Sequence, residues 1–159
     1  MIYQEISRLT RQKIMKDLDL NRSIGIYIVV HDHKETWIEK AVTSILSAID
    51  LIDESFSAKV WLIDTSENIS TQEVSEKIAL NYSIPYLNFS GLSLNRVANK
   101  ALEFVESTYI VRLDADDWVD VQFLNEVVES ISLNPYADAF IPAYTEVSED
   151  ESVIRKVIR

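Results

Sequence analysis

One stretch constrains the fold more than any other. Residues 23–30, Ser-Ile-Gly-Ile-Tyr-Ile-Val-Val, form a continuous run of mainly β-branched and aromatic side chains. Because polar residues do not alternate with apolar ones along this run, a strand formed here is expected to be buried on both faces. Such strands are typical of parallel sheets. The run therefore predicts a central strand of a parallel sheet.

Strand and helix patterns alternate along the rest of the chain. Apolar residues at helical spacing predict helices that begin near Thr36, Ser70, Leu94 and Phe123. Apolar runs predict strands over residues 59–63, 84–88, 109–113 and 138–145. Thr36 and Glu39 have the spacing of a capping box. The alternation predicts an α/β fold with a mostly parallel sheet and helices on both of its faces.

The two ends of the chain are predicted to lie outside this domain. The pattern indicates a helical extension over residues 1–22, the domain itself over residues 23–148, and an acidic, polar tail over residues 149–159. Glu146, Glu149, Asp150 and Glu151 are expected in a solvated loop. We find neither a signal-peptide pattern nor an apolar run that could span a bilayer, so we expect a cytoplasmic protein without a transmembrane segment.

The composition excludes several classes of protein. A net charge of −11 argues against nucleic acid as a partner, because binding to phosphate backbones needs a basic face. The absence of cysteine excludes disulfides and thiolate metal sites. Gly25 and Gly91 are the only glycines, and neither belongs to a G-x-G-x-x-G motif or a P-loop.

Polar side chains gather where the predicted strands end. These ends are His31-Asp-His33, Asp64-Thr-Ser66, Asn88 to Gly91, and Asp114-Ala-Asp-Asp117. Ligands of open α/β sheets bind beyond the carboxyl ends of the strands. We therefore expect a ligand site at this edge.

The last of these ends carries three carboxylates, Asp114, Asp116 and Asp117, directly after an apolar strand that we expect to be buried. Like charges this close repel one another, and burial strengthens the repulsion. A divalent cation, a helix N-terminus or raised pKa values would relieve it. Aspartate oxygens suit Mg²⁺ or Mn²⁺, and a cation held by one or two carboxylates completes its coordination with phosphate and water. In extended backbone Asp114 and Asp116 point the same way, so both can approach one ion.

The order of these elements resembles the nucleotide-binding half of family 2 glycosyltransferases of the GT-A fold. That family has a strand ending in an acid, a helix carrying Ala-Arg-Asn, and a strand leading into Asp-x-Asp-Asp. Here residues 61–66 (Trp-Leu-Ile-Asp-Thr-Ser), Asn99 and residues 109–117 (Tyr-Ile-Val-Arg-Leu-Asp-Ala-Asp-Asp) match it. The resemblance covers residues 23–148. It implies a GT-A-like fold and inverting transfer of a hexose from a nucleotide-diphosphate sugar to an acceptor.

The resemblance also implies roles for residues that bind the nucleotide-sugar. Asp64 would contact the nucleobase, and His31 stands where the family wraps its backbone around the base. Asp114 would face the ribose or a metal-bound water. Asn99, with Arg96 nearby, stands in place of the family's Ala-Arg-Asn motif.

The same resemblance implies a metal site for Mn²⁺ or Mg²⁺ at the acidic motif. Asp116 would ligate a cation that bridges the diphosphate, with Asp114 close by. Asp117 would lie beside that cation, or would cap the next helix.

The chain departs from the family pattern in ways that keep other functions open. Val30-His-Asp-His33 replaces the usual Pro-Thr-Tyr-Asn, and only 43 residues (159 − 116) follow Asp116, where the family places its acceptor half and general base. The catalytic base is therefore not assigned, and a larger polypeptide or a homo-oligomer is a possible context. One alternative is a non-catalytic binding or assembly module. Another is a small metal-dependent hydrolase that uses His31, His33 and the aspartates.

Overall fold

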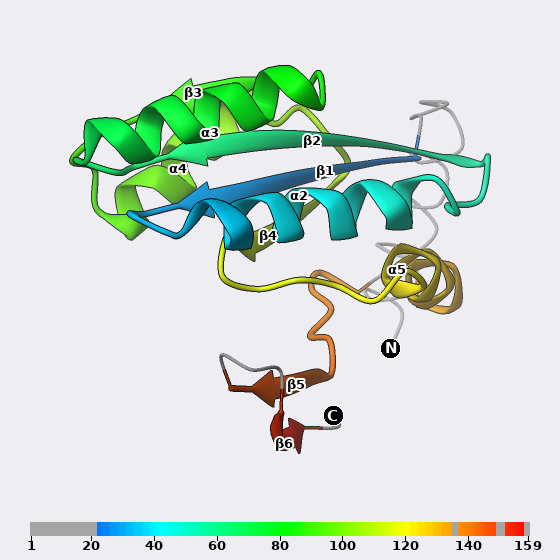
Figure 1. Cartoon of the computed structure of the whole chain (residues 1–159). Coiled ribbons are helices and arrows are strands. Elements are labelled where there is room, and N and C mark those ends of the chain that lie inside the picture. The colour runs from blue at the N-terminus through cyan, green and yellow to red at the C-terminus, as the bar shows by residue number, and fades with distance from the viewer. Residues whose placement is uncertain (1–21, 135–136, 149–151, 158–159) are drawn as a thin grey trace. The chain divides into compact units, whose positions relative to one another are not determined.

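The computed structural model describes residues 22–134, 137–148 and 152–157, which form two compact units divided after Val128 (Figure 1). Of the helical extension predicted over residues 1–22, residues 1–21 lie outside the described residues, as do Glu149, Asp150 and Glu151. None of the helices within these described ranges is long and apolar enough to cross a membrane.

The first unit is built on a four-stranded parallel sheet. Its strands are β1 (Arg22–Val30), β2 (Phe56–Asp64), β3 (Tyr86–Asn88) and β4 (Tyr109–Asp114), in the order β3-β2-β1-β4. β1 pairs in parallel with both β2 and β4, and β2 pairs in parallel with β3. The prediction of a parallel sheet with residues 23–30 at its centre is confirmed, and residues 24–30 of β1 are buried without interruption.

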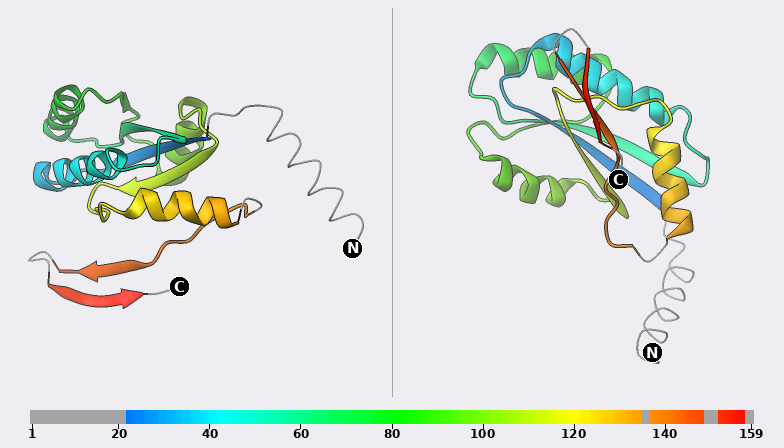
Figure 2. Two further views of the ribbon diagram at one scale, coloured as in Figure 1. Left: turned by 90° about the vertical axis from the view of Figure 1, so that its right-hand side faces the viewer. Right: turned by 90° about the horizontal axis from the view of Figure 1, so that it is seen from below.

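Helices cover both faces of this sheet, as predicted. They are α2 (Glu35–Ile49), α3 (Ile69–Asn81) and α4 (Leu94–Phe104), and α5 (Phe123–Leu133) follows the sheet in the chain. α2 and α3 lie on one side of the strands and α4 on the other (Figures 1 and 2). The crossover β3-α4-β4 therefore returns across the opposite face and places β4 beside β1.

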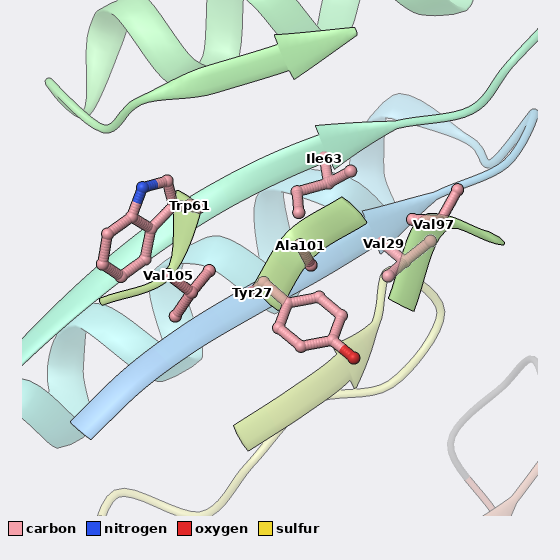
Figure 3. Close-up of a cluster of buried hydrophobic side chains, with 7 residues drawn as sticks. All are labelled: Tyr27, Val29, Trp61, Ile63, Val97, Ala101 and Val105. Atoms are coloured by element: carbon pink, nitrogen blue, oxygen red, sulfur yellow. The ribbon is translucent and has the colours of Figure 1, made fainter. Parts of the chain in front are cut away.

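The face under α4 holds a compact apolar cluster (Figure 3). Alternate residues of β1 and β2 point toward this helix, because successive side chains of a strand face opposite ways. The buried members are Tyr27, Val29, Trp61, Ile63, Val97, Ala101 and Val105. This packing fixes the ends of β1 and β2 relative to the start of α4.

Two helix starts differ from the prediction. α2 begins at Glu35 with Lys34 as its N-cap, and no side chain caps it. Thr36 and Glu39 therefore lie inside the helix, and the predicted capping box is wrong; Glu39 accepts a hydrogen bond from the Tyr82 hydroxyl at 3.1 Å instead. α3 starts one residue before Ser70, because the Asn68 side chain accepts the Ser70 N–H at 2.9 Å and acts as the cap.

The predictions for the last two strands also need correction. β4 was expected to be buried, but in the described sheet it is an edge strand that pairs only with β1, and Leu113 is its one buried residue. The strand predicted over residues 138–145 is instead β5 (Tyr144–Val147), which pairs antiparallel with β6 (Val153–Val157) in a separate two-stranded sheet. β6 falls within the segment predicted as a tail. Glu146 is in a strand rather than a loop, and its carboxylate pairs with Arg155 at 3.0 Å.

Candidate functional site

The strand ends predicted to gather do meet at one edge of the sheet. In the pairing register, Val30 at the end of β1 lies beside Asp64, and Asp64 lies beside Asn88 at the end of β3. Asp114 at the end of β4 lies beside Val29. All four strands therefore end at nearly the same level, and the four polar loops leave the sheet side by side (Figure 1). We call this the carboxyl edge.

Hydrogen bonds join the loop after β1 to the loop after β2. Asp32 has a left-handed backbone conformation (φ 53°), which is uncommon for a residue with a side chain and turns the chain sharply. Its N–H donates to Ser66 Oγ at 2.9 Å, and its Oδ1 accepts the N–H of Asn68 at 3.3 Å. The turn at Asp32 is thus held in place by the neighbouring strand end.

The same contacts define the tautomer of His31. Thr65 donates its single hydroxyl proton to the Val30 carbonyl at 2.9 Å, so its oxygen can only accept from His31 Nδ1, 3.1 Å away. Neutral His31 therefore carries its proton on Nδ1, and its Nε2 is a hydrogen-bond acceptor. Because His31 is exposed, this acceptor is available to a ligand at the carboxyl edge.

His33 has the opposite arrangement. Its Nδ1 accepts the backbone N–H of His31 at 3.0 Å, so the proton of the neutral ring lies on Nε2. That nitrogen lies 3.8 Å from Asp116 Oδ1. The two imidazoles thus have different partners, which gives no support to a hydrolase site that uses them together.

Asp64 is fully buried. Its Oδ1 accepts the N–H of Ser66 at 2.7 Å, and its Oδ2 accepts the Tyr86 hydroxyl proton at 3.2 Å. Burial, followed by the nearby Asp64 carboxylate, raises the pKa of Tyr86 far above its ordinary value, so Tyr86 remains a neutral donor. In this state Asp64 orders the turn after β2 and is covered by Tyr86.

Gln72 of α3 links the turn after β2 to the end of β3. Its Nε2 donates to the Ser66 carbonyl at 2.7 Å, and its Oε1 accepts from Asn88 Nδ2 at 3.1 Å. Neither Gln72 nor Tyr86 is among the site residues predicted from the sequence. No local motif marks either residue, because their role depends on which strand ends become neighbours.

The acidic motif follows β4 as a tight turn. The N–H of Ala115 donates to the Val29 carbonyl at 2.9 Å, and the N–H of Asp117 donates to the Asp114 carbonyl at 2.9 Å. The segment beyond it rests on α2, where Lys40 Nζ lies 3.3 Å from the ring centroid of Trp118 and Ser44 Oγ accepts the N–H of Val119 at 3.2 Å. The turn is therefore anchored at both ends.

The three carboxylates are compensated in different ways. Arg112 donates Nε and Nη2 to Oδ1 of Asp114 at 2.9 and 2.8 Å. Asp116 is half-exposed and lies near His33. For Asp117, burial raises the pKa, and repulsion from Asp116 and Asp114 raises it further, while His33 lowers it. From the sequence, a cation, a helix N-terminus or raised pKa values are expected to relieve the repulsion among these acids, and the pKa of Asp117 is indeed raised.

Asp117 does not cap the next helix, because α5 begins only at Phe123. The turn before that helix uses Asp120 instead, whose Oδ1 accepts the Gln122 N–H at 2.9 Å. The helix-cap alternative for Asp117 is therefore wrong, and its carboxylate stays beside the other two acids.

We expect Asp117→Asn to stabilise the ligand-free protein at pH 7. Since the pKa of Asp117 is raised in the fold, its favourable contribution is complete below its unfolded pKa of about 4 and is lost as the pH rises through the folded value. The variant should therefore show a higher urea midpoint at neutral pH, by less than about 1 kcal/mol because the group is partly exposed and screened. The difference in urea midpoint between the variant and the wild type should disappear below about pH 4. A difference of equal size at pH 3 would contradict this account.

Arg96 and Asn99 occupy exposed positions on α4. They are one helical turn apart, whereas Val97 and Ala101 of the same helix point into the core. Neither side chain forms a hydrogen bond or ion pair with another residue of the described chain. Arg96 and Asn99 therefore take no part in the hydrogen bonds that join the loops of the carboxyl edge.

The acidic turn fits a hard divalent cation only as a partial site. Across the described ranges, no group of three or more His, Asp or Glu side chains is placed to hold a metal ion. Asp114 and Asp116 nevertheless offer carboxylate oxygens at or near the surface. This donor set suits Mg²⁺ or Mn²⁺ bound by one or two carboxylates with the remaining positions left for phosphate and water.

Solved structures with a similar fold support the architecture of the parallel sheet. The structure is similar to that of S. aureus TarS residues 1–349, with a TM-score of 0.57 and 16% identity over 82% of this chain and 43% of that one. A second TarS structure gives a TM-score of 0.53 and 19% identity over 71% of this chain and 20% of that one. A TarS structure in complex with UDP gives 0.51 and 16%, over 82% of this chain and 43% of that one. The chain thus spans less than half of these TarS chains, and no curated protein matches it.

The sequence itself identifies the family. The model that describes glycosyl transferase family 2 matches residues 26–159, which include residues 26–30 of β1, the other three strands of the parallel sheet and the acidic turn. The fold expected from the resemblance, a GT-A-like parallel sheet flanked by helices, is confirmed by the TarS structures. The chain belongs to glycosyl transferase family 2.

Proposed function

We propose that the chain binds a nucleotide-diphosphate sugar at its carboxyl edge and serves as the donor-binding part of a glycosyltransferase. The observation that carries this proposal is the register that aligns Asp64 with Val30 and Asp114 with Val29, so that the family's two acidic positions lie at one edge of the sheet. The UDP complex of TarS, a protein of similar fold, supports a uridine nucleotide as the first ligand to test.

The nucleoside would lie over the ends of β1 and β2. His31 offers a fixed acceptor at Nε2 for an N–H or O–H of the ligand. Asp64 has no exposed surface, so a nucleobase reaches its carboxylate only if the Tyr86 hydroxyl moves away from Oδ2. Until then Asp64 acts on the ligand indirectly, by holding the Ser66 turn against which Asp32 is placed.

The diphosphate would lie over the acidic turn, and Asp114 and Asp116 would hold Mn²⁺ or Mg²⁺ there. Bound in this place, the cation supplies positive charge for the leaving diphosphate. Burial, followed by repulsion from Asp116 and Asp114, raises the pKa of Asp117, so an added positive charge would stabilise its ionised form.

Transfer to an acceptor also needs a carboxylate that deprotonates the acceptor hydroxyl. No residue of the carboxyl edge has that role in our proposal, and the chain covers 43% of TarS 1–349. We therefore propose that the acceptor half and the base lie outside residues 22–134. The complete reaction, inverting transfer of a hexose, requires that half.

The test is calorimetric titration of UDP, GDP and CDP, each with and without Mn²⁺. We expect one of them to bind in a Mn²⁺-dependent way, and Asp116→Ala to weaken that binding by about tenfold or more, as expected for the loss of a charged ligand contact. Asp50→Ala is the matched control, because Asp50 is an exposed acid at the C-terminal end of α2, next to the amino end of β2.

The outcomes separate the candidate functions. Binding that is lost in Asp116→Ala and kept in Asp50→Ala supports the donor site and identifies the base. If no nucleotide binds to the folded chain, the donor-site proposal fails, and a non-catalytic assembly module becomes the better account. Equal losses of nucleotide affinity in Asp116→Ala and Asp50→Ala would mean that binding depends only on the overall charge of the chain, which would contradict the donor site.

A further inference from the structure

Arg112 contacts the acidic turn at the carboxyl edge, and the proposed donor site gives it no role. It lies in β4 two positions before Asp114, so both side chains emerge on the same face of the strand. In the pairing register Arg112 lies beside Tyr27 and Asp114 beside Val29. The Arg112 guanidinium therefore reaches the acidic turn on the face of the sheet to which Tyr27 and Val29 belong.

The contact between these side chains is specific. Both Nε and Nη2 of Arg112 donate to the same oxygen of Asp114, Oδ1, at 2.9 and 2.8 Å. Both side chains are also partly exposed, at 37% for Arg112 and 44% for Asp114. Exposed ion pairs of this kind are worth about 0–1 kcal/mol, so a competing charge can replace either partner.

We propose that Arg112 is a built-in counter-ion that occupies Asp114 in the absence of ligand and is transferred to the donor diphosphate when cation and nucleotide bind. This inference rests on the proposed function, because it assigns Asp114 to the cation and the diphosphate to the acidic turn. It concerns positioning and regulation of that site and assigns Arg112 no chemical step.

Three features of the structure support the transfer. Oδ1 of Asp114 already accepts two hydrogen bonds from Arg112, so a divalent ion must compete with the guanidinium for this oxygen. No group of three ligating side chains is assembled among the described residues, so the protein alone offers only a weak metal site. An arginine released from a carboxylate is suited to phosphate, because its planar fork of donors matches phosphate oxygens.

The consequence is coupling between cation and nucleotide. Each ligand helps to move Arg112 from Asp114, so each should raise the affinity for the other by the same factor. Such couplings are typically about 5- to 150-fold. The ligand-free protein would then bind little free cation.

Substitutions at position 112 test this with a readout that needs no turnover. Mn²⁺ binding to the chain is measured by electron paramagnetic resonance of the free ion, and binding of the nucleoside diphosphate selected above is measured by calorimetry at saturating Mn²⁺. Arg112→Gln should bind Mn²⁺ alone about threefold to tenfold more tightly, and should bind the nucleotide about tenfold more weakly. Opposite signs are expected because the same side chain blocks the cation and holds the phosphate.

Two further variants exclude a simple effect of charge. Arg112→Lys keeps the charge but cannot form the paired contact, so its Mn²⁺ affinity should lie between those of the wild type and Arg112→Gln. Arg22→Gln removes the same charge at the amino end of β1, the opposite edge of the sheet, and should leave both affinities unchanged.

The results divide clearly. Tighter Mn²⁺ binding together with weaker nucleotide binding in Arg112→Gln supports the counter-ion. Unchanged Mn²⁺ affinity in that variant, or an Arg112→Lys chain identical to the wild type, overturns it while the donor site stands. If the wild type binds no nucleotide with Mn²⁺, the donor-site proposal fails, and this inference fails with it.

Discussion

Gly25→Val is expected to lower the free energy of unfolding by about 3 kcal/mol, the upper end of the usual cost of overfilling a core. Gly25 is in the middle of β1, between Lys59 of β2 and Ile110 of β4. A Cβ atom there would overlap Cγ1 of Val105 and lie 2.8 Å from Oγ of Ser107. The higher strand propensity of valine is worth about 1 kcal/mol at most, so the steric term dominates.

Urea denaturation measures the loss, and a second substitution tests its cause. Val105 is buried, and its β-branched side chain has little freedom to turn away. Val105→Ala removes the overlapping methyl, so the double variant Gly25→Val with Val105→Ala should lose less stability than the sum of the single variants. Strict additivity would show that Val105 is not what restricts residue 25.

The parts of the fold that could be predicted are those that depend on local pattern. The apolar run of residues 23–30 predicted a strand buried on both faces. The apolar residues at helical spacing that follow it predicted the helix that covers one of these faces, α2. Their order along the chain then predicted which ends would share an edge. These inferences hold because burial on both faces leaves no alternative side for the strand to expose.

The parts that could not be predicted depend on pairing between distant segments. Residues 149–159 were predicted as a polar tail, and nothing local shows that residues 153–157 form β6 and pair with β5. The edge position of β4 could not be predicted for the same reason, because an apolar run does not reveal whether its strand pairs with one neighbouring strand or with two. Arg112 within that run was a usable signal, since a charge in a strand favours an exposed position.

The candidate site shows the same division. The acids at strand ends were found from sequence because apolar runs ending in carboxylates are conspicuous. Their partners were not: Tyr86 reaches Asp64 only because β3 pairs with β2 in a register that sets Asn88 beside Asp64. Arg112 could have been found, since residues two apart in a strand face the same way, and an arginine there can neutralise Asp114.

Asp64→Ala is expected to be the most damaging substitution at the site, with a loss of about 2–4 kcal/mol in the free energy of unfolding. The change removes both acceptors of a fully buried side chain. The Ser66 N–H, which donates at 2.7 Å, is then left without its partner, and the Tyr86 hydroxyl loses its 3.2 Å hydrogen bond and keeps only the contact with the Gln72 carbonyl at 3.4 Å. Each unsatisfied buried donor costs about 1–3 kcal/mol, which is more than the net gain of an ordinary hydrogen bond.

Asp64→Asn separates this structural role from a role in binding. Its amide oxygen can still accept the Ser66 N–H, and its amide nitrogen can donate to the Tyr86 oxygen, so we expect a stability loss of about 1 kcal/mol, that of one perturbed hydrogen bond. Chemical denaturation of both variants measures the difference, and equal losses would show that the charge of Asp64, not its acceptors, stabilises the turn. A stable Asp64→Asn chain that binds its nucleotide about tenfold more weakly would mean that Tyr86 does move and that the carboxylate contacts the ligand. Unchanged affinity would restrict Asp64 to ordering the turn at Ser66, and would leave recognition of the base to His31 and its fixed acceptor.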